Sequence, residues 1–223
     1  MANKGGRVID LVMNVSALEG EAKDNYIRSR SEIPFKDRWF FEGIYQMCGE
    51  MLSAERRFVY ELIKRIKPGL VFEVGTRNGG GSTYFTAQAL WENAKGVIHT
   101  IEIDKGGYEL SVQNYVKYLG YLIPHVCFYC GDGAAVLKDI VPDLDVSGIV
   151  TLDGGSDQQQ IVDQYNIVLP HMKDGSWLLI HDWNNEKTAK IKPLIEADPS
   201  WRLVDKLEAP ISVGIVLYQR KTA

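Results

Sequence analysis

The sequence predicts an α/β fold: a doubly wound, mostly parallel seven-stranded sheet with a C-terminal antiparallel hairpin. From residue 70 onward, short apolar runs alternate with helical stretches, and strands joined by helices form parallel βαβ units. The runs are continuously apolar, as expected of strands covered on both faces. The last two runs are joined by a short turn containing Ala209 and Pro210, with no helix between them, which indicates a hairpin.

The predicted elements follow in order. A helix is expected from Ser53, its N-cap, to the stop at Pro68-Gly69, because Phe58, Leu62 and Ile66 recur on one face. Five strands are then expected at residues 70–74, 97–102, 126–130, 149–153 and 176–181. Helices are expected between them at 82–93, 108–119, 134–140 and 160–172. Residues 201–207 and 211–218 form the hairpin, so 51–223 make one domain.

Residues 1–50 differ from the rest of the chain. They combine a polar, Pro-containing stretch with the aromatic cluster Trp39-Phe40-Phe41. We expect this segment to form a lid or a contact in a homo-oligomer; the plainer alternative is core packing.

Composition excludes several classes of protein. The formal net charge of −4 argues against a nucleic-acid binder, which usually has a basic face, and no apolar run approaches the ~20 residues of a membrane-spanning helix. The odd number of cysteines favours a reducing, cytoplasmic location over a disulfide framework. Cys127 and Cys130 lie three apart in a predicted strand, on opposite faces. We expect them to be buried thiols rather than metal ligands.

A glycine-rich turn follows the first predicted strand. Gly75 and the run beginning at Gly79 permit a tight turn with close backbone approach, and the helix start behind them offers free N–H groups to a carboxylate. Arg77 occupies the place of the glycine that a pyrophosphate requires. The turn therefore favours a ligand with a carboxylate and an ammonium group, with Glu73 near the ammonium. The alternative is a turn with no ligand.

The next two strands end in residues suited to a nucleoside. Glu102 lies 21 positions after Gly81 (102 − 81), where an acid at the second strand's tip binds ribose hydroxyls. After the third strand, Gly133 leaves room for an adenine and Asp132 can accept a hydrogen bond from its amino group. Asp132 is equally suited to cap the helix at 134–140, and both roles are compatible.

The fourth and fifth strands end in Asp153 and in His181-Asp182. Neighbouring strands bring these side chains to one rim of the sheet, where they are candidate ligands for a divalent cation. Carboxylates suit Mg²⁺ or Mn²⁺, and the histidine also admits Zn²⁺ or Fe²⁺. The alternative is structural: Asp182 caps the following helix and His181 is a hydrogen-bonded strand-end residue.

These motifs resemble small-molecule O-methyltransferases of the catechol O-methyltransferase type. They are still more similar to the bacterial branch that contains macrocin O-methyltransferase and the cephalosporin hydroxylase relative. The similar blocks are residues 73–83, 101–104, 131–137, 149–157 and 169–183. The resemblance implies a Rossmann-like methyltransferase fold and the cofactor S-adenosylmethionine, held by Glu73, Gly75, Gly79, Glu102 and Asp132. It also implies a metal, such as Mg²⁺, at Asp153 and Asp182; Trp183 replaces the usual third ligand, which leaves His181 as its substitute.

The expected reaction is methyl transfer to a hydroxyl of a small molecule. His181 is the candidate general base and Asp153 the second catalytic residue. Thr76, Ser82, Gly133 and Asp153 are the remaining cofactor contacts that we expect. The alternatives are a cephalosporin-hydroxylase-like enzyme, an NAD-dependent oxidoreductase and a non-catalytic cofactor-binding subunit.

Overall fold

The computed structural model describes residues 51–155, 157–208 and 212–221. The predicted segment 1–50 lies outside these residues. The fold is a seven-stranded sheet in the order β3-β2-β1-β4-β5-β7-β6. Strands β1 to β5 are parallel, and β7 is antiparallel to both β5 and β6. The predicted fold class is confirmed, including the C-terminal hairpin.

The strands lie close to their predicted positions. They are β1 (Leu70–Val74), β2 (Val97–Glu102), β3 (Val126–Cys130), β4 (Ile149–Leu152), β5 (Trp177–His181), β6 (Trp201–Leu207) and β7 (Ile215–Arg220). Strand β7 begins later than predicted because the chain just before it pairs with the loop after β5. There the N–H groups of Trp183 and Asn184 donate to the carbonyls of Gly214 and Val213.

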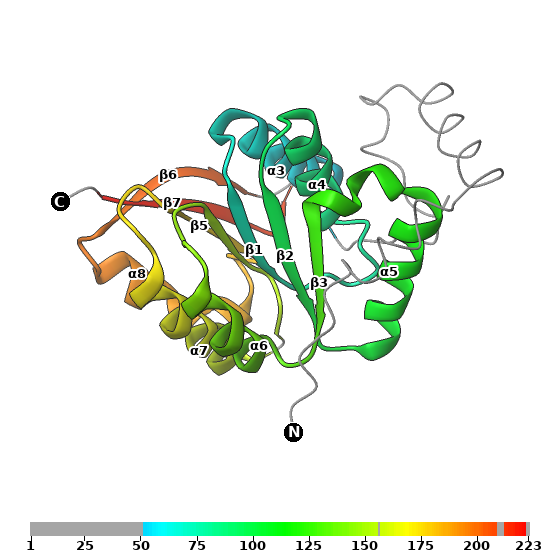
Figure 1. Cartoon of the computed structure of the whole chain (residues 1–223). Helices are drawn as coiled ribbons and strands as arrows, with labels where there is room; N and C mark the ends of the chain where they lie inside the picture. The colour runs from blue at the N-terminus through cyan, green and yellow to red at the C-terminus, as the bar shows by residue number, and fades with distance from the viewer. Residues whose placement is uncertain (1–50, 156, 209–211, 222–223) are drawn as a thin grey trace.

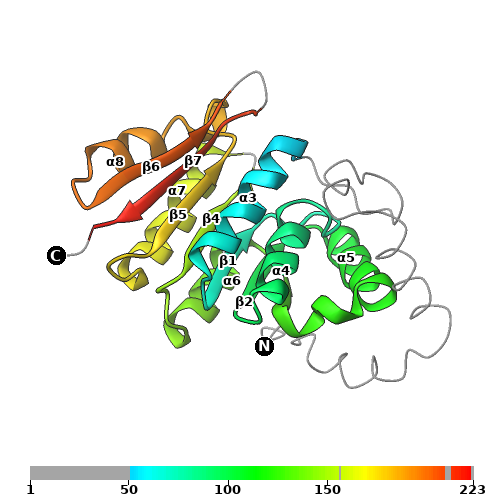
Figure 2. The same cartoon turned by 90° about the horizontal axis from the view of Figure 1, so that it is seen from above.

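Within the described residues, six α-helices cover the two faces of the sheet (Figures 1 and 2). They are α3 (Ser53–Ile66), α4 (Ser82–Glu92), α5 (Lys105–Tyr118), α6 (Gly133–Ile140), α7 (Gln158–Val168) and α8 (Ile191–Ala197). Helix α7 ends earlier than predicted because Pro170 follows it. The short helix α8 carries no strong periodic signal and was not predicted. Ser53 is the first residue of α3 rather than its N-cap, a place that Leu52 takes.

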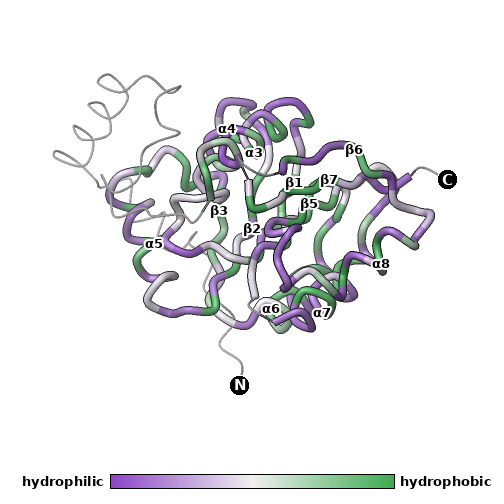
Figure 3. Tube along the Cα trace, turned by 180° about the vertical axis from the view of Figure 1, so that it is seen from behind, coloured by the Kyte–Doolittle hydropathy of each residue, from purple (hydrophilic) through white to green (hydrophobic). Residues whose placement is uncertain are grey.

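Alternation along the strands divides the apolar side chains between two cores. Val71 and Ile98 pack with α3, α4 and α5, whereas Phe72 and Ile101 face α6, α7 and α8. Figure 3 shows the central strands as largely hydrophobic. Helix α4 is enclosed from Ser82 to Leu90, because α3 packs along its outer side.

The two thiols of β3 differ in their exposure. The prediction that both thiols are buried is wrong for Cys130, which is exposed at the carboxyl end of β3, while Cys127 is partly buried. No helix among the described residues is long and apolar enough to cross a membrane.

Candidate active site

A cavity of about 680 Å³ opens at the carboxyl ends of the parallel strands, the position at which doubly wound sheets bind ligands. Its size is typical of a small-molecule site. Most of the predicted site residues line it: Gly75, Thr76, Ser82, Glu102, Asp132, Gly133, Asp153, His181 and Asp182. The exceptions are Glu73 and Gly79.

The glycine turn shapes one side of the cavity. Gly75 has a φ of 109°, and a Cβ at this position would lie 3.0 Å from the backbone nitrogen of Gly154. The tips of β1 and β4 therefore meet closely only because Gly75 has no side chain. Beyond it the chain enters α4 at Gly81, which has no side-chain cap, and Ser82, the first helical residue, lies at the cavity wall. The first N–H groups of a helix have no acceptor within the helix and can bind an anion.

Glu73 lies beneath this turn rather than in the cavity. It is buried on the α4 side of β1, where its Oε2 accepts hydrogen bonds from Thr83 Oγ1 at 2.5 Å and Thr100 Oγ1 at 2.6 Å. Burial raises the pKa of Glu73 to about 7, although hydrogen bonds from Ser82, Thr100 and Thr83 act against this shift. The structure thus places Glu73 as a buried anchor of the turn, outside the residues that line the cavity.

Gly79 also serves packing. Its missing Cβ would lie 2.9 Å from the Tyr115 ring of α5, and its carbonyl accepts a hydrogen bond from the Tyr115 hydroxyl at 3.1 Å. Gly79 therefore fixes the turn against α5 and is not among the residues that line the cavity.

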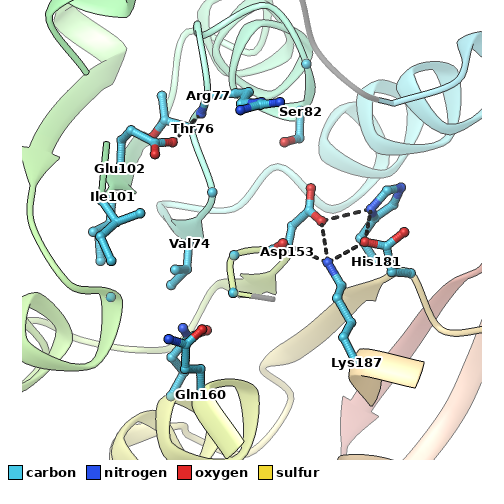
Figure 4. Close-up of a pocket in the computed structure, with 18 of the residues that line it drawn as sticks. Val74, Thr76, Arg77, Ser82, Ile101, Glu102, Asp153, Gln160, His181 and Lys187 are labelled. Carbon is cyan, nitrogen blue, oxygen red and sulfur yellow. Dashed lines mark hydrogen bonds and ion pairs between the residues drawn. The ribbon is translucent and has the colours of Figure 1, made fainter. Parts of the chain in front are cut away.

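Glu102 lies at the tip of β2, beside Thr76 and Arg77 of the glycine turn (Figure 4). Its Oε2 accepts from the Arg77 N–H at 2.6 Å, and its Oε1 accepts from the Asp104 N–H at 2.9 Å. Each carboxylate oxygen retains a lone pair for a further donor. Two backbone hydrogen bonds therefore orient Glu102 for hydroxyl groups in the cavity.

The turn after β3 contains Asp132 and Gly133 and lies near Gln164, a residue not predicted from the sequence. Asp132 caps α6 by accepting from the Ala135 N–H at 2.9 Å and also lines the cavity, so both roles predicted for it are compatible with the structure. Gln164 of α7 lies next to Gly133. Gln164 is only 3% exposed, and its Oε1 has no hydrogen-bond partner among the described residues. Since buried polar atoms are normally paired, Gln164 indicates a donor supplied by a ligand.

A group of charged side chains lies at the tips of β4 and β5. His181 Nδ1 lies 2.8 Å from Asp153 Oδ1, and Lys187 Nζ lies 2.9 Å from the Asp153 carbonyl and 3.3 Å from Oδ1. The Lys187 ammonium also contacts Asp182 Oδ2. Figure 4 shows Lys187 reaching up between the two strand ends.

Glu55 joins this group from α3. It is completely buried, and its Oε2 lies 3.1 Å from His181 Nε2. Its Oε1 accepts hydrogen bonds from Ser212 Oγ at 2.7 Å and the Val213 N–H at 2.9 Å. Glu55 was not identified from the sequence, because it lies 126 residues from His181 and follows the ordinary charge pattern of a helix.

The three carboxylates determine the state of His181. Burial opposes a charge on the ring, but hydrogen bonds to Asp153, Asp182 and Glu55 outweigh it and raise the pKa of His181 to about 11. Burial would likewise raise the pKa of Asp182, yet His181 and Lys187 lower it to about 2. His181 is therefore an imidazolium at neutral pH that donates from both nitrogens, which argues against the predicted role of general base.

Asp153, His181 and Asp182 lie close enough to bind one cation, with their ligand atoms within 4.8 Å of one another. Apart from Asp153 Oδ2, however, their ligand atoms are already engaged by other described groups. Asp153 Oδ1 and Asp182 Oδ2 contact Lys187, Asp182 Oδ1 accepts from Asn185 Nδ2, and both nitrogens of His181 face carboxylates. A ligating imidazole must give up a proton. As arranged here, these residues do not fit a divalent cation. Trp183 packs against Tyr218 and is not among the residues that line the cavity.

Comparison with known proteins agrees with this architecture. No curated protein matches the sequence. Two solved structures cover the described fold at low identity. An O-methyltransferase from Bacillus cereus in complex with SAH has a TM-score of 0.63 at 15% identity and covers 95% of this chain and 97% of its own. The O-methyltransferase TomG from Streptomyces achromogenes, involved in tomaymycin synthesis and in complex with SAM, has a TM-score of 0.61 at 15% identity, with 96% of each chain covered.

The sequence itself matches a family model. The model describes a methyltransferase domain and matches residues 72–183, half of the chain and the part that runs from β1 to the end of β5. The predicted resemblance and fold are thereby confirmed. The chain belongs to this methyltransferase-domain family and has the class I methyltransferase fold.

Proposed function

We propose that the protein transfers a methyl group from S-adenosylmethionine to a hydroxyl of a small molecule. One observation carries the proposal. A single cavity brings together the start of α4 at Gly81 and Ser82, the carboxylate of Glu102 and the unpaired Gln164 Oε1. These groups match, in order, an amino-acid carboxylate, ribose hydroxyls and an adenine amino group.

Two glycines at the cavity wall lie too close to neighbouring protein atoms to carry a side chain. Side chains at Gly75 and Gly133 would collide with their surroundings: a Cβ at Gly133 would lie 2.7 Å from Val74 Cγ1. Both glycines thus keep backbone at the cavity wall. S-adenosylmethionine, when bound, supplies a methyl group on a positively charged sulfur. The residues of the chain hold the two reactants in line and exclude water, which is the main task for an already activated donor.

The charged group supports a cationic donor. Glu55, Asp153 and Asp182 carry three negative charges, and His181 and Lys187 carry two positive ones, which leaves one negative charge at the cavity wall. A nearby positive sulfur is favoured by this imbalance. For the acceptor, Lys187 is the donor that can orient a hydroxyl oxygen. Both side-chain contacts of Asp153 use Oδ1, so Oδ2 is available among the described groups to accept the hydroxyl proton.

Calorimetric titration tests the proposal directly. We expect S-adenosylmethionine and S-adenosylhomocysteine to bind one site per chain, NAD not to bind, and Glu102→Ala to weaken binding of the first two. A screen of hydroxyl acceptors with methyl-labelled cofactor then tests transfer. Binding of NAD in place of S-adenosylmethionine would overturn the cofactor assignment. Binding without transfer to any acceptor would instead support a non-catalytic subunit, and a hydroxylated product would support the cephalosporin-hydroxylase-like alternative.

A further inference from the structure

The position between Asp153 and Asp182 is occupied by a side chain of the protein itself. Lys187 Nζ lies 3.3 Å from Asp153 Oδ1 and 2.9 Å from the Asp153 carbonyl oxygen, and it contacts Asp182 Oδ2. Its side chain is 14% exposed. One ammonium thus has oxygens from both strand tips around it, and it is largely shielded from water.

The loop after β5 holds Lys187 at this position. Asp182 has a φ of 58°, a left-handed conformation that costs energy for a residue other than glycine and persists only where its surroundings hold it. The Asn185 N–H donates to the Asp182 carbonyl at 2.8 Å, and the Asn185 Nδ2 donates to Asp182 Oδ1 at 2.8 Å. Thr188 Oγ1 donates to the Trp183 carbonyl at 2.9 Å. These bonds hold residues 182–188 in a compact loop next to α7, with Lys187 in the short 3₁₀ turn Glu186–Thr188.

The third candidate ligand, His181, is already paired with carboxylates. The two nitrogens of His181 are directed to Asp153 and to Glu55. Glu55 is in turn fixed by Ser212, Val213 and the Leu52 N–H, which donates to Oε2 at 2.7 Å. Binding a metal through His181 Nδ1 would break the contact of that nitrogen with Asp153 Oδ1.

We propose that Lys187 is the resident cation of this site, in place of a divalent metal, and that methyl transfer by this chain needs no added metal. The second half of this inference, transfer without added metal, rests on the proposed function, because it places Lys187 at the end of the cavity where the acceptor binds. Its first half, the exclusion of a divalent cation by Lys187, stands on the contacts alone. A divalent cation bound by Asp153 and Asp182 would lie next to the Lys187 ammonium. The two cations would repel each other strongly, so they cannot share the carboxylates.

Manganese binding to the full-length protein tests the first half without any substrate. Electron paramagnetic resonance titration with Mn²⁺ is carried out on the wild type, Lys187→Met and the matched control Lys190→Met, whose lysine is exposed and bonds only Gln159 Oε1 among the described groups. We expect the wild type and Lys190→Met to bind weakly. Lys187→Met should bind Mn²⁺ about tenfold or more tightly, and adding Asp182→Asn to it should remove the gain.

The outcomes separate clearly. A wild type that binds one Mn²⁺ tightly, with loss of binding in Asp182→Asn, would overturn the inference, as would a Lys187→Met variant that keeps its fold and binds no better than the wild type. The wild-type titration does not depend on whether the variant folds.

Turnover tests the second half of the inference. Rates of methyl transfer after treatment with chelator should stay within about twofold of rates with Mg²⁺, whereas a large stimulation by Mg²⁺ would contradict it. If S-adenosylmethionine does not bind at all, the proposed function fails while the Mn²⁺ result still stands.

Discussion

His181 is the residue on which the charges of the site depend. It is 4% exposed and lies between Asp153 and Glu55. In the imidazolium form, each ring nitrogen donates its own N–H to one of these carboxylates. Removing one partner of such a buried pair usually destabilises a protein by several kcal/mol, because the other charge remains buried. The ionisation of His181 is therefore linked to folding.

The linkage gives a pH dependence of stability. The pKa of His181 is about 11 when folded, against 6.5 for the free side chain, so the folded state holds the proton more tightly than the unfolded state. This stabilisation is complete below pH 6.5 and is lost as pH rises from there toward 11. We expect the free energy of unfolding, measured by urea denaturation, to fall over that range. His181→Gln should fall much less steeply, and equal slopes for the two proteins would contradict the shift.

Gln164 gives a prediction about the adenine end of the cavity. Its unpaired Oε1 should accept from the amino group of the base, so Gln164→Leu should weaken S-adenosylhomocysteine binding about tenfold without loss of stability. The exposed Gln159 of the same helix supplies the control, Gln159→Ala. Calorimetry with S-inosylhomocysteine, which carries an oxygen instead of the amino group, completes the comparison. The wild type should discriminate between the two ligands and Gln164→Leu should not; undiminished discrimination in the variant would exclude this contact.

At the scale of elements, the site depends on how the tips of β1 and β4 meet. Gly75 and Gly175 both have a positive φ, but a Cβ at Gly75 would lie 3.0 Å from backbone, whereas nothing lies within 4 Å of one at Gly175. Gly175→Ala should therefore show the conformational penalty alone, about 1 kcal/mol. Gly75→Ala adds a backbone collision, which should raise the loss to about 2–4 kcal/mol and also weaken the cofactor. Denaturant midpoints measure the difference, and equal losses would show that the strand tips are not in tight contact.

The elements themselves were largely predictable from the sequence. Strands buried on both faces give continuous apolar runs, and the glycine turn after Val74 marks where the first of them ends. Helix α8 was missed because it is short and contains Pro193. Loop 182–188 was missed for another reason: residues 184–188 are all polar and carry no periodic signal. The position of Lys187 depends on the left-handed backbone of Asp182, which no local pattern predicts for an aspartate.

At the scale of the whole molecule, the contacts that complete the site join distant parts of the chain. Glu55 bonds partners 126 and 157 residues away, and these pairings follow from sheet order, which the sequence does not reveal. The residues at strand ends could be predicted because parallel strands all end at one edge. Glu55 and Gln164 come from helices whose rotation about their axes is set by packing, so their direction toward the cavity could not.

A ligand that binds this assembled site should stabilise the entire domain. At a concentration about a hundredfold above its Kd, S-adenosylmethionine should add about 2.7 kcal/mol to the free energy of unfolding. For a domain of this size that corresponds to a rise in Tm of roughly 5–10 °C, whereas NAD should have no effect. Differential scanning calorimetry checks the shift. Because the ligand binds only the folded state, an unchanged Tm at saturation would contradict binding at the proposed site.

The enclosure of α4 has a consequence for how recognition takes place. Because α4 is buried from Ser82 to Leu90, its packing keeps it from tilting or sliding toward a ligand. The N–H groups at its start are therefore oriented toward the cavity before a ligand binds. The protein then loses little conformational entropy when a ligand binds, and the preformed cavity selects ligands by shape rather than by rearranging around them.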